Sequence, residues 1–293
     1  MKIKSTLGNY AFVLPAVTVF AIFYLIPFSW VFQLSLYKWN AIDPVKTFLG
    51  LENFREVFTD RYWWQSMLNA GYITLIALTL QNILAFTLAW ACDREIRLKG
   101  FYRVIFFLPP ILSEMVVGMV WHYILSDIDG ANLLNRLLIG IGFPQLVHSW
   151  LSDPEIALTT VAVVHSWKGF GWGFLIFLAG LQTIPQELYE AARVDGANAW
   201  RCFKNITFPL MLPVTVLVAI LTVLGTMQAF VLIIGLVGGE LGGYTSVPVL
   251  RILASMRGSS RFGYACAQGI TFGFILVIVS FIQYRFSKRV RYV

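Results

Sequence analysis

Long runs of apolar residues alternate with shorter polar segments along this chain, and these runs decide its class. A helix needs about 20 predominantly apolar residues to cross the hydrocarbon core of a bilayer. Because the runs are continuously apolar and do not alternate with polar residues, they predict transmembrane helices and not the strands of a membrane barrel. We place six spans near residues 10–36, 66–91, 101–125, 156–182, 210–236 and 264–286.

Composition supports an integral membrane protein. Of the 293 residues, 58% are hydrophobic and only 13% are charged, whereas about a quarter of the residues of a typical soluble domain are charged. The mean hydropathy is +0.72. We therefore expect an all-α polytopic protein, with residues 1–293 forming a single transmembrane domain surrounded by membrane lipid.

The positions of Lys and Arg predict the orientation of the spans. With the N-terminus inside, the inner segments carry thirteen of these residues and the outer segments carry eight, while Lys168 lies within the fourth span. An excess of basic residues marks the cytoplasmic side, so we expect both termini in the cytoplasm. The net charge of +7 then has a topological explanation, and we expect no nucleic-acid partner. The run from Tyr10 to Leu36 is too long for a signal peptide and is interpreted as an uncleaved first span.

The charged segment between the fourth and fifth spans, residues 183–209, lies in the cytoplasm in this topology. Thr183, followed by Pro185 and Gln186, resembles the start of a helix capped by the threonine. The spacing of Glu190 and Arg193 permits an ion pair along that helix. Gly196 predicts its end, because glycine adopts the left-handed conformation that stops helices.

A second short helix is predicted from Asn198 to about Thr207, and Pro209 marks the start of the fifth span. Small and apolar side chains form one narrow face of the first helix, namely Leu188, Ala191, Ala192 and Asp195. Periodicity leaves two interpretations open. The helix either lies on the membrane surface or docks its small-residue face into a cytoplasmic partner.

A longer pattern in this segment resembles a known motif. Glu190-Ala191-Ala192 is followed after three residues by Gly196, and after nine more by Ile206, one residue and Phe208-Pro209. This spacing is similar to the EAA motif of the permease subunits of binding-protein-dependent ABC importers, except that the family usually has Leu where this chain has Phe208.

The resemblance extends over nearly the whole chain. It is similar to the first of two permease subunits in carbohydrate importers of the maltose and glycerol-phosphate type. The matching segments are Tyr10–Pro15, Tyr24–Pro27, Gly50-Leu51-Glu52-Asn53-Phe54, Leu108-Pro109-Pro110, Trp121, Asn135, Leu181–Pro185 and Phe262-Gly263-Tyr264-Ala265.

This resemblance implies a type I ABC importer permease fold in the bacterial cytoplasmic membrane. It also implies a heterodimer with a second permease, two copies of a cytoplasmic ATPase, an extracytoplasmic solute-binding protein and a carbohydrate substrate. ATP and Mg would be bound by the partner ATPase, and no cofactor by this chain. The coupling helix would span about 185–196 and move as a lever when the ATPase closes. The residues assigned to coupling are Glu190, Ala191, Ala192, Asp195, Gly196, Ile206 and Pro209.

Polar residues inside the predicted spans are candidates for a substrate pathway, because a central charge costs about 2.5–3.5 kcal/mol to insert. For Asn and Gln residues, hydrogen bonds between helices explain the same positions. Tryptophans near span ends are equally explained as membrane anchors. The pathway candidates are Glu114, His165, Trp167, Lys168, Trp172 and Gln228.

Two other functions are alternatives to the importer. Glu114, His165 and Lys168 would also suit an ion-coupled secondary carrier, which has no need of an EAA pattern. An enzyme is not expected, because the chain has neither HExxH nor GxSxG and no GxxxxGK[ST] sequence for binding nucleotide. The three cysteines, Cys92, Cys202 and Cys266, have no metal-ligand spacing.

Overall fold

The computed structural model describes residues 12–93, 97–126, 132–238, 243–258 and 260–290, and the side chains up to 288. The chain divides into two compact units. Unit 1 contains residues 1–61 and 252–275, and unit 2 contains residues 62–251 and 276–293. The expectation of a single transmembrane domain stays a prediction.

Unit 1 begins with an apolar helix over Phe12–Leu34. A two-residue antiparallel pair follows, with Tyr37 opposite Phe48, so the all-α expectation holds apart from this short ribbon. The unit's elements are η1 (Ala21–Leu25), α2 (Ile26–Leu34), β1 (Tyr37–Lys38), β2 (Thr47–Phe48), α3 (Glu52–Thr59), the last residues of α14 (Pro248–Arg257) and the first half of α15 (Phe262–Val290).

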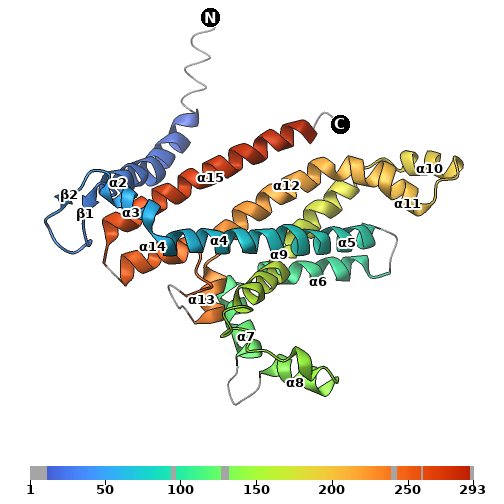
Figure 1. Cartoon of the computed structure of the whole chain (residues 1–293). Helices are drawn as coiled ribbons and strands as arrows, with labels where there is room; N and C mark the ends of the chain where they lie inside the picture. Colours follow the sequence, from blue (N-terminus) through green and yellow to red (C-terminus); the bar gives the residue numbers. More distant parts are fainter. Residues whose placement is uncertain (1–11, 94–96, 127–131, 239–242, 259, 291–293) are drawn as a thin grey trace, which may run out of the picture. The chain divides into compact units, whose positions relative to one another are not determined.

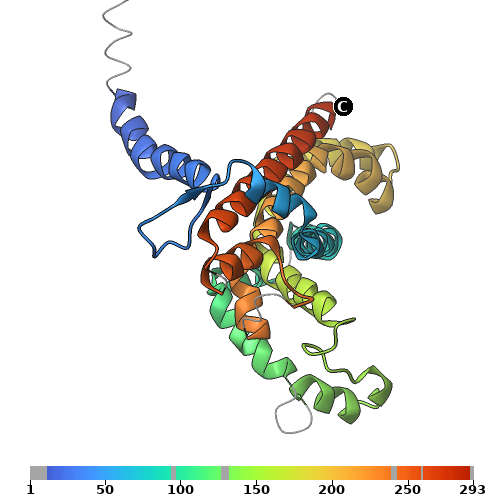
Figure 2. The same cartoon turned by 60° about the vertical axis from the view of Figure 1, so that its left-hand side comes forward.

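Unit 2 is built around α9, the helix with the largest buried share among the candidate spans. Aromatic and small apolar side chains of α5, α9 and α12 form its main core, with Phe174, Phe177 and Met211 almost fully buried. The elements are α4 (Arg61–Ile76), η2 (Ala77–Gln81), α5 (Asn82–Asp93), α6 (Lys99–Ile111), α7 (Glu114–Leu125), α8 (Leu133–Gly140), η4 (Pro144–Leu146), α9 (Ala157–Leu181), α10 (Gln186–Val194), α11 (Ala199–Cys202), η5 (Phe203–Thr207), α12 (Phe208–Met227) and α13 (Val231–Val237). Within unit 2, α10 and α11 lie at one end and α8 at the other (Figures 1 and 2).

Most predicted spans correspond to single long helices. The described residues contain five helices long and apolar enough to cross a membrane: Phe12–Leu34, Arg61–Asp93, Ala157–Leu181, Ala199–Met227 and Phe262–Lys288. The fifth span differs from its prediction at both ends, because its helix begins at α11 and stops at Met227. Residues 231–237 then form the separate helix α13.

The third predicted span, 101–125, is broken into α6 and α7, which meet at 93°. Pro109 and Pro110 lie in the last turn of α6 and remove two backbone donors from it. Leu112 and Ser113 are extended, with ψ of 144° and 135°. The described residues therefore contain six candidate spans only if this bent pair counts as one, and the cytoplasmic position of the termini stays a prediction.

Helix α7 packs closely against α13. A side chain at Gly118 would come within 2.6 Å of the Leu232 carbonyl oxygen and 2.9 Å of the Gly235 backbone. His122 Nδ1 lies 2.7 Å from the Leu236 carbonyl oxygen. Small residues at this crossing let the two backbones approach, as in other membrane helix pairs.

Candidate functional site

The predicted end of the helix between the fourth and fifth spans is present at Gly196. Helix α10 covers Gln186–Val194, and Gly196 has the left-handed φ of +76°. The Ala197 amide donates to the Ala192 carbonyl (2.8 Å) and the Gly196 amide to the Arg193 carbonyl (3.0 Å). These two bonds form a Schellman motif, which satisfies carbonyl groups left open at a helix end.

The prediction that Thr183 caps the start of this helix is wrong. The Thr183 hydroxyl donates to the Gly180 carbonyl of the preceding helix at 2.7 Å, so it does not cap α10, whose cap position is occupied by Pro185. The reason is geometric, because Thr183 lies in the turn just after α9 and reaches a carbonyl three residues back more easily than an amide ahead. The structure shows no ion pair between Glu190 and Arg193, both of which it describes.

Most motif residues in and just after α10 are exposed. Glu190, Ala191, Asp195 and Gly196 are exposed, and Ala192 is half-buried. Two apolar neighbours are exposed as well, since Leu188 is 43% and Val194 is 87% exposed. A face that combines small, apolar and acidic groups in this way suits contact with another protein surface.

The other side of α10 is fastened to the fifth span. The hydroxyls of Tyr189 and Thr207 lie 2.8 Å apart. Tyr189 and Ile206 also pack against the main core of unit 2, in which Ile184 is buried. Sequence reasoning assigned Ile206 but missed Tyr189, whose only signal was an aromatic side chain with a polar tip between charged residues.

Helix α11 is joined to the spans by aromatic contacts of Phe203. Its ring lies 5.2 Å from that of Trp90 and 5.5 Å from that of Trp200. Asn198 caps α11 by accepting from the Arg201 amide at 2.9 Å, as a helix start at this residue requires. Pro209 lies in the first turn of α12, as expected for the start of the fifth span. The second short helix is not separate from that span, because one helical run continues from Ala199 to Met227.

Four of the six pathway candidates surround one cavity in unit 2. Its volume is about 360 Å³, and it is lined by Glu114, His165, Lys168 and Trp172. Lys168 Nζ lies 3.7 Å from Glu114 Oε1, with the lysine side chain 10% exposed and the glutamate side chain 40% exposed. The break between α6 and α7 places Glu114 in the first turn of α7.

The two remaining candidates lie away from this lining. Trp167 packs edge-on against Trp121, with ring centroids 5.4 Å apart. Gln228 forms the C-terminal cap of α12. Gln81, a glutamine inside the second predicted span, also lines the cavity, and its Oε1 atom is buried without a hydrogen-bond partner.

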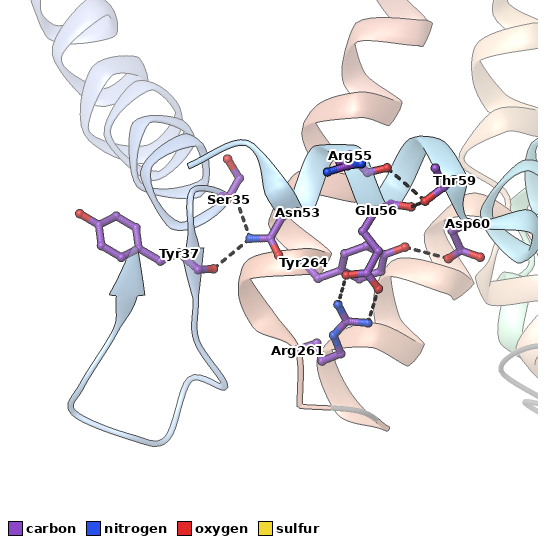
Figure 3. A network of polar contacts seen from close by, with 9 residues as sticks. All are labelled: Ser35, Tyr37, Asn53, Arg55, Glu56, Thr59, Asp60, Arg261 and Tyr264. Atoms are coloured by element: carbon purple, nitrogen blue, oxygen red, sulfur yellow. Dashed lines mark hydrogen bonds and ion pairs between the residues drawn. The ribbon is translucent and has the colours of Figure 1, made fainter. Parts of the chain in front are cut away.

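A polar network in unit 1 joins two of the segments that matched carbohydrate permeases (Figure 3). The buried Asn53 donates to the carbonyls of Ser35 at 2.8 Å and Tyr37 at 3.0 Å. Arg261 forms a two-pronged ion pair with Glu56, and this hydrogen bonding raises the pKa of Arg261 above its ordinary value.

The same network includes the start of α15. The Tyr264 hydroxyl donates to Asp60 at 2.7 Å, and the Gly263 amide donates to the Trp39 carbonyl at 3.1 Å. The network therefore holds the ends of α2, α3 and α15 together. Asn53, Gly263 and Tyr264, which belong to the segments that resemble carbohydrate permeases, thus have a structural role in unit 1.

The chain is similar over most of its length to known transport proteins. The family model described as "binding-protein-dependent transport system inner membrane component" matches residues 81–292. The sn-glycerol-3-phosphate transport system permease protein UgpA of Agrobacterium fabrum is 32% identical, covering 97% of this chain and 96% of that protein. The trehalose/maltose transport system permease protein MalF of Thermococcus litoralis is 31% identical, covering 84% and 82%.

Among solved structures, a chain of a bacterial ABC transporter involved in the import of the acidic polysaccharide alginate has a TM-score of 0.80. It is 23% identical, and the match covers 98% of this chain and 97% of that one. This likeness establishes the fold, which is that of an ABC importer permease.

Proposed function

The chain belongs to the family of inner membrane components of binding-protein-dependent transport systems, and we propose that it is the permease subunit of an ATP-driven importer for a sugar or oligosaccharide. The observation that carries the coupling role is the form of α10. It is a short, exposed helix with a fixed glycine end, fastened to the fifth span through Tyr189 and Thr207.

The proposed assembly contains a second permease subunit, two copies of a cytoplasmic ATPase and an extracytoplasmic solute-binding protein. ATP and Mg belong to the ATPase, since this sequence lacks the GxxxxGK[ST] pattern that binds nucleotide phosphates. The chain itself is proposed to be a permease without enzymatic activity. The exposed apolar and acidic groups of α10 support the ATPase contact.

The proposed mechanism transmits ATPase closure as a rigid movement. When the ATPase subunits approach each other, the surface that holds α10 moves. Tyr189 and Ile206 couple α10 to the core formed by α5, α9 and α12. Because packed interiors deform little, a displacement of α10 is passed to these helices, which then change the side from which the cavity is open.

The proposed substrate class rests on two supports. The relatives at 31% and 32% identity are named for trehalose or maltose and for sn-glycerol-3-phosphate. The cavity combines an aromatic face, Trp172, with hydrogen-bonding groups such as Gln81 and Lys168, and sugars are bound by such combinations. Family membership favours the importer over an ion-coupled carrier.

Uptake by the reconstituted complex tests this function. Proteoliposomes containing both permeases and the ATPase, with the solute-binding protein outside and ATP inside, should accumulate the sugar that the binding protein retains. Uptake should stop without ATP and persist when a protonophore or sodium ionophore collapses ion gradients. Uptake that survives ATP removal and is abolished by the ionophore would identify a secondary carrier.

A further inference from the structure

We propose that Glu114 determines the charge selectivity of the cavity in unit 2 by neutralising Lys168, so that the cavity admits uncharged, hydroxyl-bearing solutes and excludes anions. This inference rests on the proposed transport function, because it concerns the solute that enters the same cavity. It goes further by naming the side chain that sets the solute's charge.

The side chains of Lys168 and Glu114 differ in their burial. Lys168 lies near the middle of α9, and its side chain is almost buried. Its ammonium group therefore faces the cavity in a low-dielectric setting, where one unpaired charge acts strongly on any charged solute. Glu114 is more exposed and lies at the N-terminus of α7, where the helix dipole favours a carboxylate.

Apart from His165, the rest of the lining has no ionisable side chain. Gln81 contributes an amide side chain to the lining, and its buried Oε1 atom has no hydrogen-bond partner. The Thr222 hydroxyl donates to Asn82 Oδ1 at 3.0 Å, and Trp172 adds an exposed aromatic face. With the Lys168 charge cancelled by Glu114, these groups form a neutral surface with donors, an acceptor and a stacking face, which matches a sugar ring and not a carboxylate or phosphate.

A purely structural explanation makes a different prediction. A lysine inside a span is costly on its own, so Glu114 would serve only to make insertion of α9 tolerable. In that case removal of the carboxylate lowers the amount of folded protein but leaves the charge preference of the cavity unchanged in the protein that remains.

Thiol modification of a reporter cysteine separates the two explanations. Gly225 lines the cavity, and a side chain there would meet open space, so Gly225→Cys is introduced after the three native cysteines are replaced by alanine. The purified complex is treated with methanethiosulfonate reagents of similar size, one carrying a sulfonate and one a trimethylammonium group. The measured quantity is the ratio of the anionic to the cationic reaction rate.

With Glu114 intact, the ratio should match that of a small free thiol. Glu114→Gln should raise it about tenfold, because one uncompensated positive charge then faces the cavity. Lys168→Gln should lower it by a similar factor, and Glu114→Gln combined with Lys168→Gln should restore it. A Glu114→Gln ratio within twofold of the parent would overturn the proposal.

The double variant and the charge swap Glu114→Lys with Lys168→Glu keep the test decisive if a single variant fails to fold. Both should give the parent ratio, and a shift of several-fold in either would refute charge compensation. The reaction rates do not depend on transport. A complex that shows the expected ratios but takes up no sugar with ATP would therefore refute the importer function while supporting the role of Glu114.

Discussion

At the scale of single residues, the proposed coupling depends on the backbone conformation of Gly196. Its φ is +76°, and a side chain there would contact nothing. The cost of substitution therefore comes from the backbone alone, about 1–2 kcal/mol for an L residue. We expect Gly196→Val to reduce ATP-dependent uptake at least about tenfold, since 1.4 kcal/mol corresponds to a factor of ten.

The matched control at this position is Gly196→Asn, because asparagine tolerates the left-handed conformation. It should retain most of the uptake at equal amounts of protein in the membrane. Sugar-stimulated ATPase activity at the wild-type level in Gly196→Val would show that the turn is not needed for coupling.

Tyr189 gives a second test at the residue scale. Tyr189→Phe removes the hydroxyl that bonds Thr207 and keeps the ring in the core, at a net cost of about 1 kcal/mol. We expect the number of sugar molecules transported per ATP hydrolysed to fall several-fold, while ATPase subunits still copurify. Thr207→Val should produce the same loss, and the double variant should be no worse than either single one. Additive losses would mean that the hydrogen bond does not transmit the movement.

Asn53 tests the network of unit 1. Asn53→Ala leaves the carbonyls of Ser35 and Tyr37 without their donor, and buried unsatisfied groups cost about 1–3 kcal/mol. We expect a lower apparent Tm of the detergent-purified complex. Arg55→Ala is the control on the same helix, because its side chain is 79% exposed and exposed ion pairs contribute little. Equal Tm values for the two variants would contradict the structural role of Asn53.

Residue types predicted the ends of helices better than they predicted which groups bond to each other. Gly196 was found because glycine alone adopts its conformation without strain, and the Asn198 cap followed from the same kind of rule. The hydroxyl of Thr183 donates to the Gly180 carbonyl of the preceding helix and does not cap the following one. The sequence does not say which of these backbone groups lies nearer to the hydroxyl. Tyr189 was missed since its partner is eighteen residues away.

At the scale of elements, the bend between α6 and α7 is the main departure from the hydropathy pattern. Residues 101–125 are apolar almost throughout, and hydropathy records residue type but not chain direction. Pro109 and Pro110 were the only sign of a break, and prolines also occur inside continuous membrane helices. The break brings Glu114 to Lys168, a pairing that spacing along the sequence does not reveal.

The crossing of α7 and α13 provides a prediction for this element. Gly118→Val would overlap the backbone of α13 at Leu232 and Gly235, and such overpacking costs about 1–3 kcal/mol or more. We expect a large loss of folded protein, seen as aggregation in size-exclusion chromatography. Gly71→Ala within α4 meets open space and should be neutral or slightly stabilising. A monodisperse Gly118→Val protein would contradict the close packing.

At the scale of the whole molecule, exposed apolar surface indicates that the chain needs an apolar environment. The most apolar window of the helix Phe12–Leu34 has no buried residues, so lipid or another subunit must cover it. Composition was sufficient to predict a membrane protein, because such a surface is stable only in an apolar solvent. The identity of the covering subunits is not contained in composition, and only the EAA resemblance pointed to them.

The central claim is that α10 contacts the ATPase, and site-directed crosslinking measures this contact directly. A cysteine at the exposed Ala191, in a chain without native cysteines, should form a short bifunctional crosslink to a cysteine in the ATPase groove, and ATP should change its yield. A cysteine at Leu137 in α8, which is 58% exposed, should form none. Crosslinking from Leu137 but not from Ala191 in a complex that still transports sugar would contradict the account.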